Sequence, residues 1–205
     1  MAQKKNVLIF LICCVFFSCS QPDRGRSSNV EQPGYKKYLI KAGTFENMNV
    51  LSTISVHMAF KTIIYFDDYG MKECRDTYSA DSLEERFMCD GMNTYKIIPK
   101  EKTAYLVGKA YRGTEPRFSW DEVDKADKKS GTAKRLADTS IAGKECERYK
   151  VASENVTATF AGYRNISFLT MIISRGGTSL TRCVAIKIMD IPEEKFRIPE
   201  GYVVK

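Results

Sequence analysis

Hydrophobic and polar residues alternate along much of the chain. In residues 54–61 the apolar side chains occupy every second position, at Ile54, Val56, Met58 and Phe60. A period of two predicts a strand with one buried face. The β-prone residues 62–66 extend this strand, and the sequence DDYG at residues 67–70 then predicts a turn.

Further segments repeat this pattern. The sequence PKEK at residues 99–102 separates two β-prone segments and predicts a hairpin. Four later strands are expected at residues 145–151, 156–160, 166–173 and 180–188. The glycines in residues 175–178 favour a tight turn between the last two. In the final strand, alternation places Val184, Ile186 and Ile188 on one face. The fold class is therefore mainly β (α+β).

One segment has helical features instead. Ser119 and Glu122 form a capping box, acidic residues open the segment and Gly131 closes it. Trp120, Val123 and Ala126 share one face of this expected helix. Core packing explains the apolar stripe; alternatively, Trp120 helps to gate a cavity.

The N-terminal residues have the features of an export signal. Lys4 and Lys5 precede an unbroken apolar run at residues 7–17, and Ser18 and Cys19 follow it. Eleven apolar residues rise only about 16 Å as a helix, which is too short to span a bilayer. The segment resembles a bacterial lipoprotein signal, in which the cysteine is acylated and becomes the first residue of the mature chain. Cleavage by an ordinary signal peptidase is the alternative.

This interpretation divides the chain into three parts. Residues 1–18 form the signal peptide, residues 19–34 form a flexible polar tether, and residues 35–205 form one domain. The residue directly after Cys19 is Ser20 rather than Asp, which favours the outer membrane over retention in the inner membrane. The tether has no dense acidic run that would indicate display at the cell surface, so the domain is expected to face the periplasm.

Four cysteines remain in the domain: Cys74, Cys89, Cys146 and Cys183. A two-residue turn at Asp81–Ser82 would place Cys74 opposite Cys89, and a disulfide is possible there in an oxidising compartment. Reduced thiols and other pairings stay open. The chain has one histidine and no Cys-x-x-Cys motif, so no metal site is expected.

Charge and motifs exclude several function classes. The chain carries a formal charge of +7, and the mature chain +5, with the basic residues scattered rather than clustered. This distribution does not favour nucleic acid as a partner. Nucleotide-binding, metalloprotease and serine-hydrolase motifs are missing, and His57 lies opposite the apolar positions of its strand. We therefore expect neither an enzyme nor a bound cofactor.

Three segments resemble the LolA-like and LolB-like superfamily of lipoprotein carriers, as found in Bacteroidota lipoproteins of unknown function. They are residues 63–72 (IIYFDDYGMK), 141–149 (IAGKECERY) and 196–202 (FRIPEGY). The resemblance implies a curved antiparallel sheet, or incomplete β-barrel, with one or few helices on its concave face. It also implies a cavity for acyl chains.

Under this resemblance the residues expected to line the cavity are Ile54, Val56, Met58, Phe60, Trp120, Val184 and Ile186. The expected function is a membrane-anchored envelope lipoprotein that binds a lipid or other hydrophobic ligand. The alternative is a non-catalytic structural or interaction module of an envelope complex, in which the same residues fill a solid core. A protein partner in the envelope is possible under either interpretation.

Overall fold

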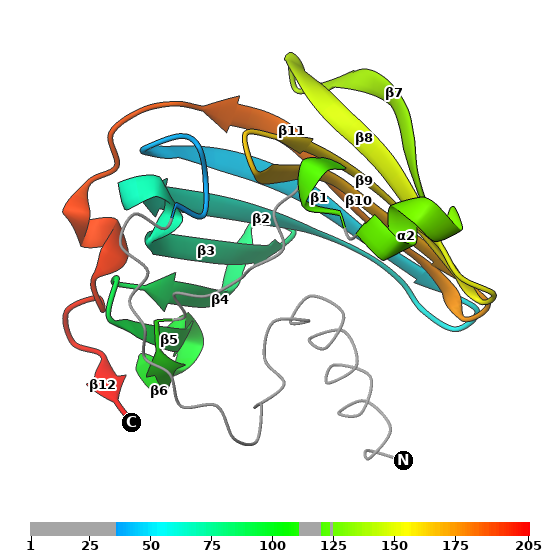
Figure 1. Ribbon diagram of the computed structural model, residues 1–205. Helices are drawn as coiled ribbons and strands as arrows, with labels where there is room; N and C mark the ends of the chain where they lie inside the picture. The colour runs from blue at the N-terminus through cyan, green and yellow to red at the C-terminus, as the bar shows by residue number, and fades with distance from the viewer. Residues whose placement is uncertain (1–35, 111–119, 124) are drawn as a thin grey trace, which may run out of the picture. The chain divides into compact units, whose positions relative to one another are not determined.

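A computed structural model describes residues 36–110, 120–123 and 125–205. All of them belong to one compact unit, Gly34–Lys205. Within this described part the chain forms a single sheet of twelve strands, ordered β12-β6-β5-β4-β3-β2-β1-β11-β10-β9-β8-β7 (Figure 1). The signal segment, Cys19 and Ser119 of the expected capping box lie outside the described residues.

The first half of the sheet consists of β1 (Gly43–Thr53), β2 (His57–Asp67), β3 (Lys72–Ser79), β4 (Ser82–Cys89), β5 (Asn93–Ile98) and β6 (Thr103–Lys109). The second half consists of β7 (Ala133–Ile141), β8 (Lys144–Ala152), β9 (Val156–Tyr163), β10 (Ile166–Ser174), β11 (Gly177–Lys187) and β12 (Val203–Val204). The short helical segments are η1 (Asp68–Gly70), η2 (Pro99–Glu101), η3 (Trp120–Glu122), α2 (Lys125–Ser130) and η4 (Glu193–Phe196).

The sheet is built from two meanders, β1–β6 and β7–β11. Each pairs neighbouring strands of the sequence, and the antiparallel pair β1–β11 joins the two. Among the described strands only β12 runs parallel to its partner, β6. The long strands bend around η3 and α2, which lie on one side of the sheet (Figure 1). The prediction of a mainly β, mostly antiparallel open sheet is thus confirmed.

The N-terminal segment of the domain packs on the first hydrophobic cluster. The Tyr38 ring makes edge contacts with Phe45 and Phe66, at centroid distances of 6.0 and 4.9 Å. A Cβ at Gly70, whose φ is +86°, would lie 2.6 Å from the Tyr38 ring. The turn predicted at residues 67–70 therefore needs glycine both for its backbone conformation and for this close approach.

The C-terminal segment covers the second cluster. Ile191 and Phe196 pack on the buried side chains of Cys74, Met88, Ile97 and Ala104. Lys195 lies with its Nζ 4.1 Å from the centre of the Tyr65 ring. The last residues then pair with β6, so both ends of the described domain are fixed to the sheet.

The hairpin β3–β4 corrects the predicted register. Its turn is Ala80–Asp81, one residue earlier than expected, which moves every pairing by two residues. A bulge at Thr77/Tyr78 moves the pairings beyond it back by one, so the net shift at Cys74 is one residue. Cys74 therefore lies opposite Met88, and Cys89 lies opposite Glu73. A shift of one residue places the two cysteines on opposite faces. Both are free thiols, so the Cys74–Cys89 disulfide considered possible from the sequence is not formed.

The single helix expected after residue 119 is instead two short pieces. A 3₁₀ turn, η3, is followed by the six-residue helix α2, which ends at Gly131 with a φ of +77°. The end signal at Gly131 is thus confirmed, and the prediction of one continuous helix is wrong. Six residues are too few to be stable as an isolated helix, so tertiary packing must hold α2 in place.

Candidate functional site

The candidate site is the face of the sheet that carries η3 and α2, which we call the inner face. Directly paired residues of neighbouring strands project from the same face, so the pairings define its composition. One row crosses seven strands through Met58, Leu51, Ser179, Ile172, Ala158, Val151 and Ala133. Apart from Ser179 these residues are apolar, and none of the row is charged. This row forms an apolar floor near the β1–β2 and β10–β11 turns.

The next row of the inner face is aromatic towards both ends and polar in the middle. Phe60, Asn49, Thr181, Thr170, Phe160, Tyr149 and Arg135 follow one another across the same strands. The rings of Phe160 and Tyr149 lie 5.2 Å apart. The Trp120 ring lies 6.0 Å from the Tyr149 ring, which places η3 over this end of the row.

Asn49 organises the polar middle of this row. Its Nδ2 donates to Oγ1 of Thr62 at 3.2 Å, and its Oδ1 accepts a hydrogen bond of 2.9 Å from Oγ1 of Thr181. These bonds join β2, β1 and β11 through side chains as well as through the backbone. The neighbouring Asn47, with 6% of its surface exposed, differs: its buried Oδ1 has no hydrogen-bond partner in the described part of the chain. A buried polar atom of this kind is destabilising.

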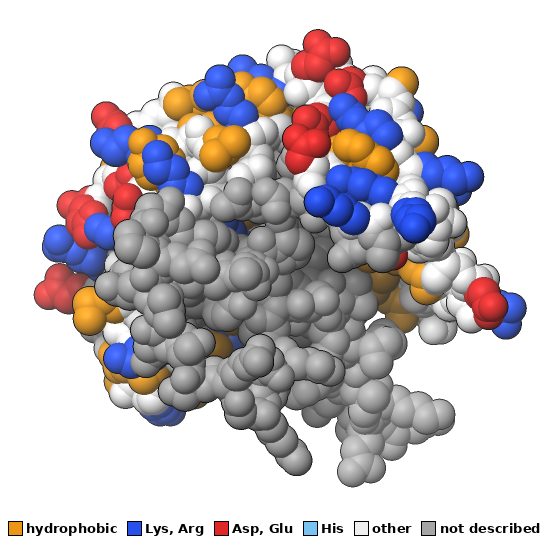
Figure 2. Space-filling model, in the orientation of Figure 1, with side chains coloured by type: hydrophobic (Ala, Val, Ile, Leu, Met, Phe, Trp, Pro, Cys, Tyr) orange, Lys and Arg blue, Asp and Glu red, His pale blue; other side chains and the backbone are white. Residues whose placement is uncertain are grey.

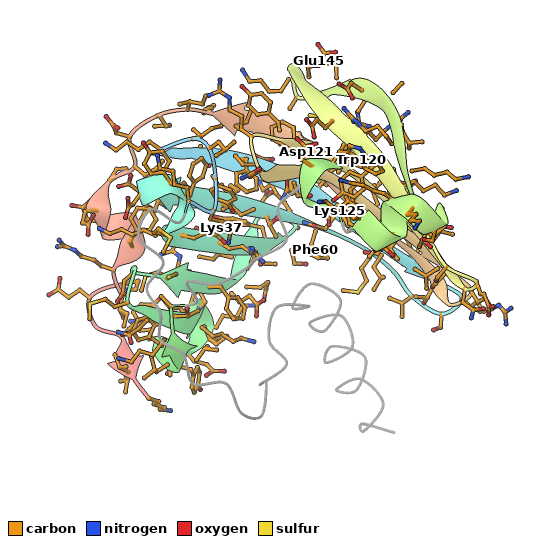
Figure 3. The ribbon with its side chains drawn as sticks, viewed as in Figure 1. Lys37, Phe60, Trp120, Asp121, Lys125 and Glu145 are labelled. Atoms are coloured by element: carbon orange, nitrogen blue, oxygen red, sulfur yellow. The ribbon has the colours of Figure 1, made fainter. Side chains whose placement is uncertain are left out.

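Besides the Tyr149 ring, two further residues hold Trp120 at the edge of the inner face. Its backbone N–H donates to the Glu147 carboxylate at 3.0 Å. Lys128 lies with its Nζ 4.8 Å from the Trp120 ring centre and also donates to the Asp121 carbonyl at 3.3 Å. Figure 3 shows Trp120 and Phe60 on the side of the sheet occupied by Lys125. Figure 2 shows basic side chains gathered over α2.

A charged cluster lies beside the inner face where the N-terminal segment meets β3. The Glu73 carboxylate accepts a hydrogen bond of 2.7 Å from the Tyr38 hydroxyl and lies 2.9 Å from Lys37 Nζ. Arg75 lies 3.2 Å from its other oxygen. Burial opposes ionisation of Glu73, but the charges of Lys37 and Arg75 outweigh it and lower the pKa to about 2. Burial and then the Glu73 charge raise the pKa of Tyr38.

A second charged group is buried on the opposite face, under the C-terminal segment. Asp76 is fully buried and binds Arg86 through two hydrogen bonds, the longer being 2.8 Å from Nη2 of Arg86 to Oδ2. Burial and then Asp76 raise the pKa of the nearby Cys74 to about 12, so this thiol stays protonated at neutral pH. The geometry of the Asp76–Arg86 pair indicates a structural role, because each charge is satisfied by the other.

The structure brings together part of the set expected to line a cavity. Met58, Phe60 and Trp120 share the inner face, and Ile186 packs at its far end, opposite Phe45. Val56 precedes β2 and is half-buried.

Two residues of that set are placed elsewhere. Ile54 lies in the β1–β2 turn and is 100% exposed, so its assignment to a strand is wrong. Val184 is exposed because a bulge opposite Glu46/Asn47 adds one residue to β11. The extra residue shifts the alternation, so Ile186 shares a face with Cys183 rather than with Val184.

Much of the inner face was not predicted from the sequence. Leu51, Val151, Phe160 and Ile172 belong to it. The last three lie in predicted strands, whereas Leu51 lies in β1, for which no strand was predicted. Alternation within a strand shows which residues share a face, but not which face of one strand matches that of the next. The pairing register supplies this information.

Two features of the described residues concern metal ligands and membrane-spanning helices. Among these residues, no group of three or more His, Cys, Asp or Glu side chains could hold a metal ion. In the same part of the chain no helix combines the length and apolar character needed to cross a membrane.

Comparisons with known proteins place this fold among solved structures. No family model matches the sequence, and no curated protein matches it. An uncharacterised conserved protein from Thermus thermophilus is similar in structure with a TM-score of 0.54 and 8% identity, covering 82% of this chain and 91% of that one. At this identity the similarity is one of fold alone.

Two further structures are similar at low identity. A LolA superfamily protein from Nitrosomonas europaea has a TM-score of 0.45 and 9% identity, covering 78% of this chain and 91% of its own. A putative outer membrane lipoprotein-sorting protein domain from Vibrio parahaemolyticus has a TM-score of 0.42 and 8% identity, covering 77% and 89%.

Proposed function

We propose that this protein is a non-catalytic, membrane-anchored envelope lipoprotein whose domain binds a lipid or other hydrophobic ligand on its inner face. The observation that carries the proposal is the apolar row from Met58 to Ala133. It crosses seven strands without a charged residue, and the Trp120 ring packs on Tyr149 in the neighbouring row. Sites for small apolar molecules are lined in this way, by hydrophobic side chains with a few polar groups at defined places.

The described residues leave this floor partly open. Met58 is 39% exposed, and Leu51 and Ile172 are half-buried, although all three lie in strands with paired neighbours on both sides. An alkyl chain lying along the row would remove this surface from water at a gain of about 25 cal/mol per Å². The short helix α2 precedes Ala133, the last residue of the row, and Trp120 packs on Tyr149 in the next row.

The anchor is the second part of the proposal. Acylation of Cys19 and the tether of residues 19–34 would hold the domain of residues 35–205 at the outer membrane, facing the periplasm. More than one acyl chain gives stable membrane attachment. Metabolic labelling with a clickable fatty acid tests this: wild-type protein takes up label and Cys19→Ala does not. A wild-type protein without label would exclude the anchor.

Native mass spectrometry of the detergent-extracted protein tests ligand binding. We expect a co-purified lipid in addition to the anchor. Leu51→Gln places a polar group in the middle of the apolar floor and should lose this lipid. Ser52→Gln is the matched control, because the next residue of the same strand projects from the opposite face. If both variants retain the lipid equally, the inner face is excluded as its binding site.

One observation favours the alternative of a structural or interaction module. The hydrogen bonds from Thr62 through Asn49 to Thr181 satisfy these side chains internally and make part of the inner face self-contained. An envelope protein would then be the partner. A ligand-free wild-type protein in native mass spectrometry, with its anchor intact, would support this alternative over lipid binding.

A further inference from the structure

We propose that the outer face of the sheet, opposite η3 and α2, binds the surface of an anionic lipid bilayer. The contact is made by a patch that we call the outer patch. It consists of Met48, Val50, Ala59, Lys61, Met171, Ile173, Leu180 and Arg182. The outer patch is distinct from the inner face, so this inference does not depend on ligand binding there.

The pairing register assembles the outer patch from four central strands. Ala59, Val50, Leu180 and Met171 form one row across β2, β1, β11 and β10. Lys61, Met48 and Arg182 form the next row. Each of these residues is a sequence neighbour of an inner-face residue and therefore projects from the other side of the sheet.

The outer patch is accessible in the described part of the chain. Met48 is 39% exposed and Ile173 is 45% exposed, whereas most methionines and isoleucines are buried. Ala59 and Arg182 are exposed, and the other members are half-buried. No member belongs to either of the two hydrophobic clusters that pack the domain. Contiguous apolar surface of this kind marks an interaction site.

Charge identifies the partner. The two rows continue across β9, β8 and β7 and add the basic residues Lys150, Lys134 and Arg148. Neither row contains Asp or Glu at any paired position. Lys61 reaches over the Tyr78 ring, at 5.2 Å from its centre, so its charge stays on this face. Basic residues of this kind are attracted to anionic headgroups over about one Debye length.

A bilayer fits the outer patch better than an acidic protein does. The backbone groups of these central strands are already paired within the sheet, so a protein could not extend it by adding a strand here. The aliphatic side chains are interspersed with basic ones, an arrangement suited to shallow contact with headgroups and the acyl boundary. Such contact does not demand shape complementarity.

Vesicle flotation of residues 34–205 tests the inference without the anchor. This compact unit contains every described strand and both hydrophobic clusters. We expect it to float with phosphatidylglycerol–phosphatidylethanolamine vesicles at low salt and not with phosphatidylcholine vesicles. The double variant Lys61→Glu/Arg182→Glu should bind at least tenfold more weakly. Val50→Ser/Leu180→Ser should also bind more weakly, although its charge is unchanged.

The control is Lys125→Glu/Lys129→Glu on α2, which changes the net charge by the same amount at exposed positions outside the outer patch. It should keep most of the binding. If the two charge variants lose vesicle binding equally, the vesicles attract the net positive charge of the whole protein rather than the outer patch. That result would overturn the inference. Absence of wild-type binding to anionic vesicles would also overturn it. Circular dichroism melting confirms that each variant is folded.

Discussion

The Tyr38 hydroxyl donates a hydrogen bond of 2.7 Å to the Glu73 carboxylate and thereby fastens the N-terminal segment of the domain to β3. Lys37, the preceding residue, reaches the same carboxylate oxygen at 2.9 Å. The attachment point lies only a few residues beyond the tether that we propose for residues 19–34. We therefore expect any pull transmitted from a membrane anchor to act first on these bonds.

Replacement of Glu73 should loosen this attachment. Glu73→Gln removes the charge that pairs with Lys37 and Arg75 and should lower the free energy of unfolding by about 2 kcal/mol. Tyr38→Phe removes one hydrogen bond and keeps the ring contacts, so its cost should be nearer about 1 kcal/mol. Urea denaturation measures both. Equal stability of wild type and Glu73→Gln would contradict the assigned role.

Stability should fall in acid through this carboxylate. The pKa of Glu73 is lowered from 4.5 to about 2 in the folded protein. Its contribution is therefore present above pH 4.5 and is lost as the pH falls from about 4.5 towards 2, because the unfolded chain binds the proton more readily. The contribution is on the order of 3 kcal/mol. Glu73→Gln should flatten the pH dependence in this window when melting is followed at each pH.

Single and double variants of the buried ion pair Asp76–Arg86 should differ in stability. Arg86→Met leaves the fully buried Asp76 without its bidentate partner and should destabilise the fold by about 3–5 kcal/mol. The double variant Asp76→Leu/Arg86→Met removes both charges and should recover most of this loss. Thermal melting distinguishes the cases. A double variant as unstable as Arg86→Met would show that the pair does more than satisfy its own charges.

The two inner-face asparagines should respond in opposite directions to the same substitution. Asn47→Leu removes a buried oxygen that has no partner among the described residues and should raise stability by about 1 kcal/mol. Asn49→Leu breaks the bonds to Thr62 and Thr181 and should lower stability by about 1–3 kcal/mol. Chemical denaturation measures the stability of both variants. A change in stability of the same sign in both would refute the prediction.

Local sequence signals predicted the fold class and several turns. The hairpin turns at Pro99–Glu101 and Arg175–Gly176 form where proline and glycine favour them. These features depend on a few adjacent residues, so one sequence is enough to identify them. The end of α2 at Gly131 was predicted for the same reason.

Registers and faces were harder to predict because they depend on distant partners. Alternation from Ile54 to Phe60 looked like one strand, but the Thr53–Val56 turn occupies its first half. Bulges at Thr77/Tyr78 and opposite Glu46/Asn47 shift the pairing by one residue, which changed the neighbour of Cys74 and the face of Val184. The polar group around Asn49 depends on three strands and leaves no local pattern.

The pairing of β1 with β11 has a consequence for the order of assembly. Most other pairs join neighbouring strands of the sequence and can form as hairpins soon after both strands are available. The β1–β11 pair lies in the centre of the sheet yet joins segments near the two ends of the domain. Bringing such distant segments together is slow, and until then β1 presents an unpaired edge. During synthesis the chain must therefore keep this edge protected until almost its last strand is available.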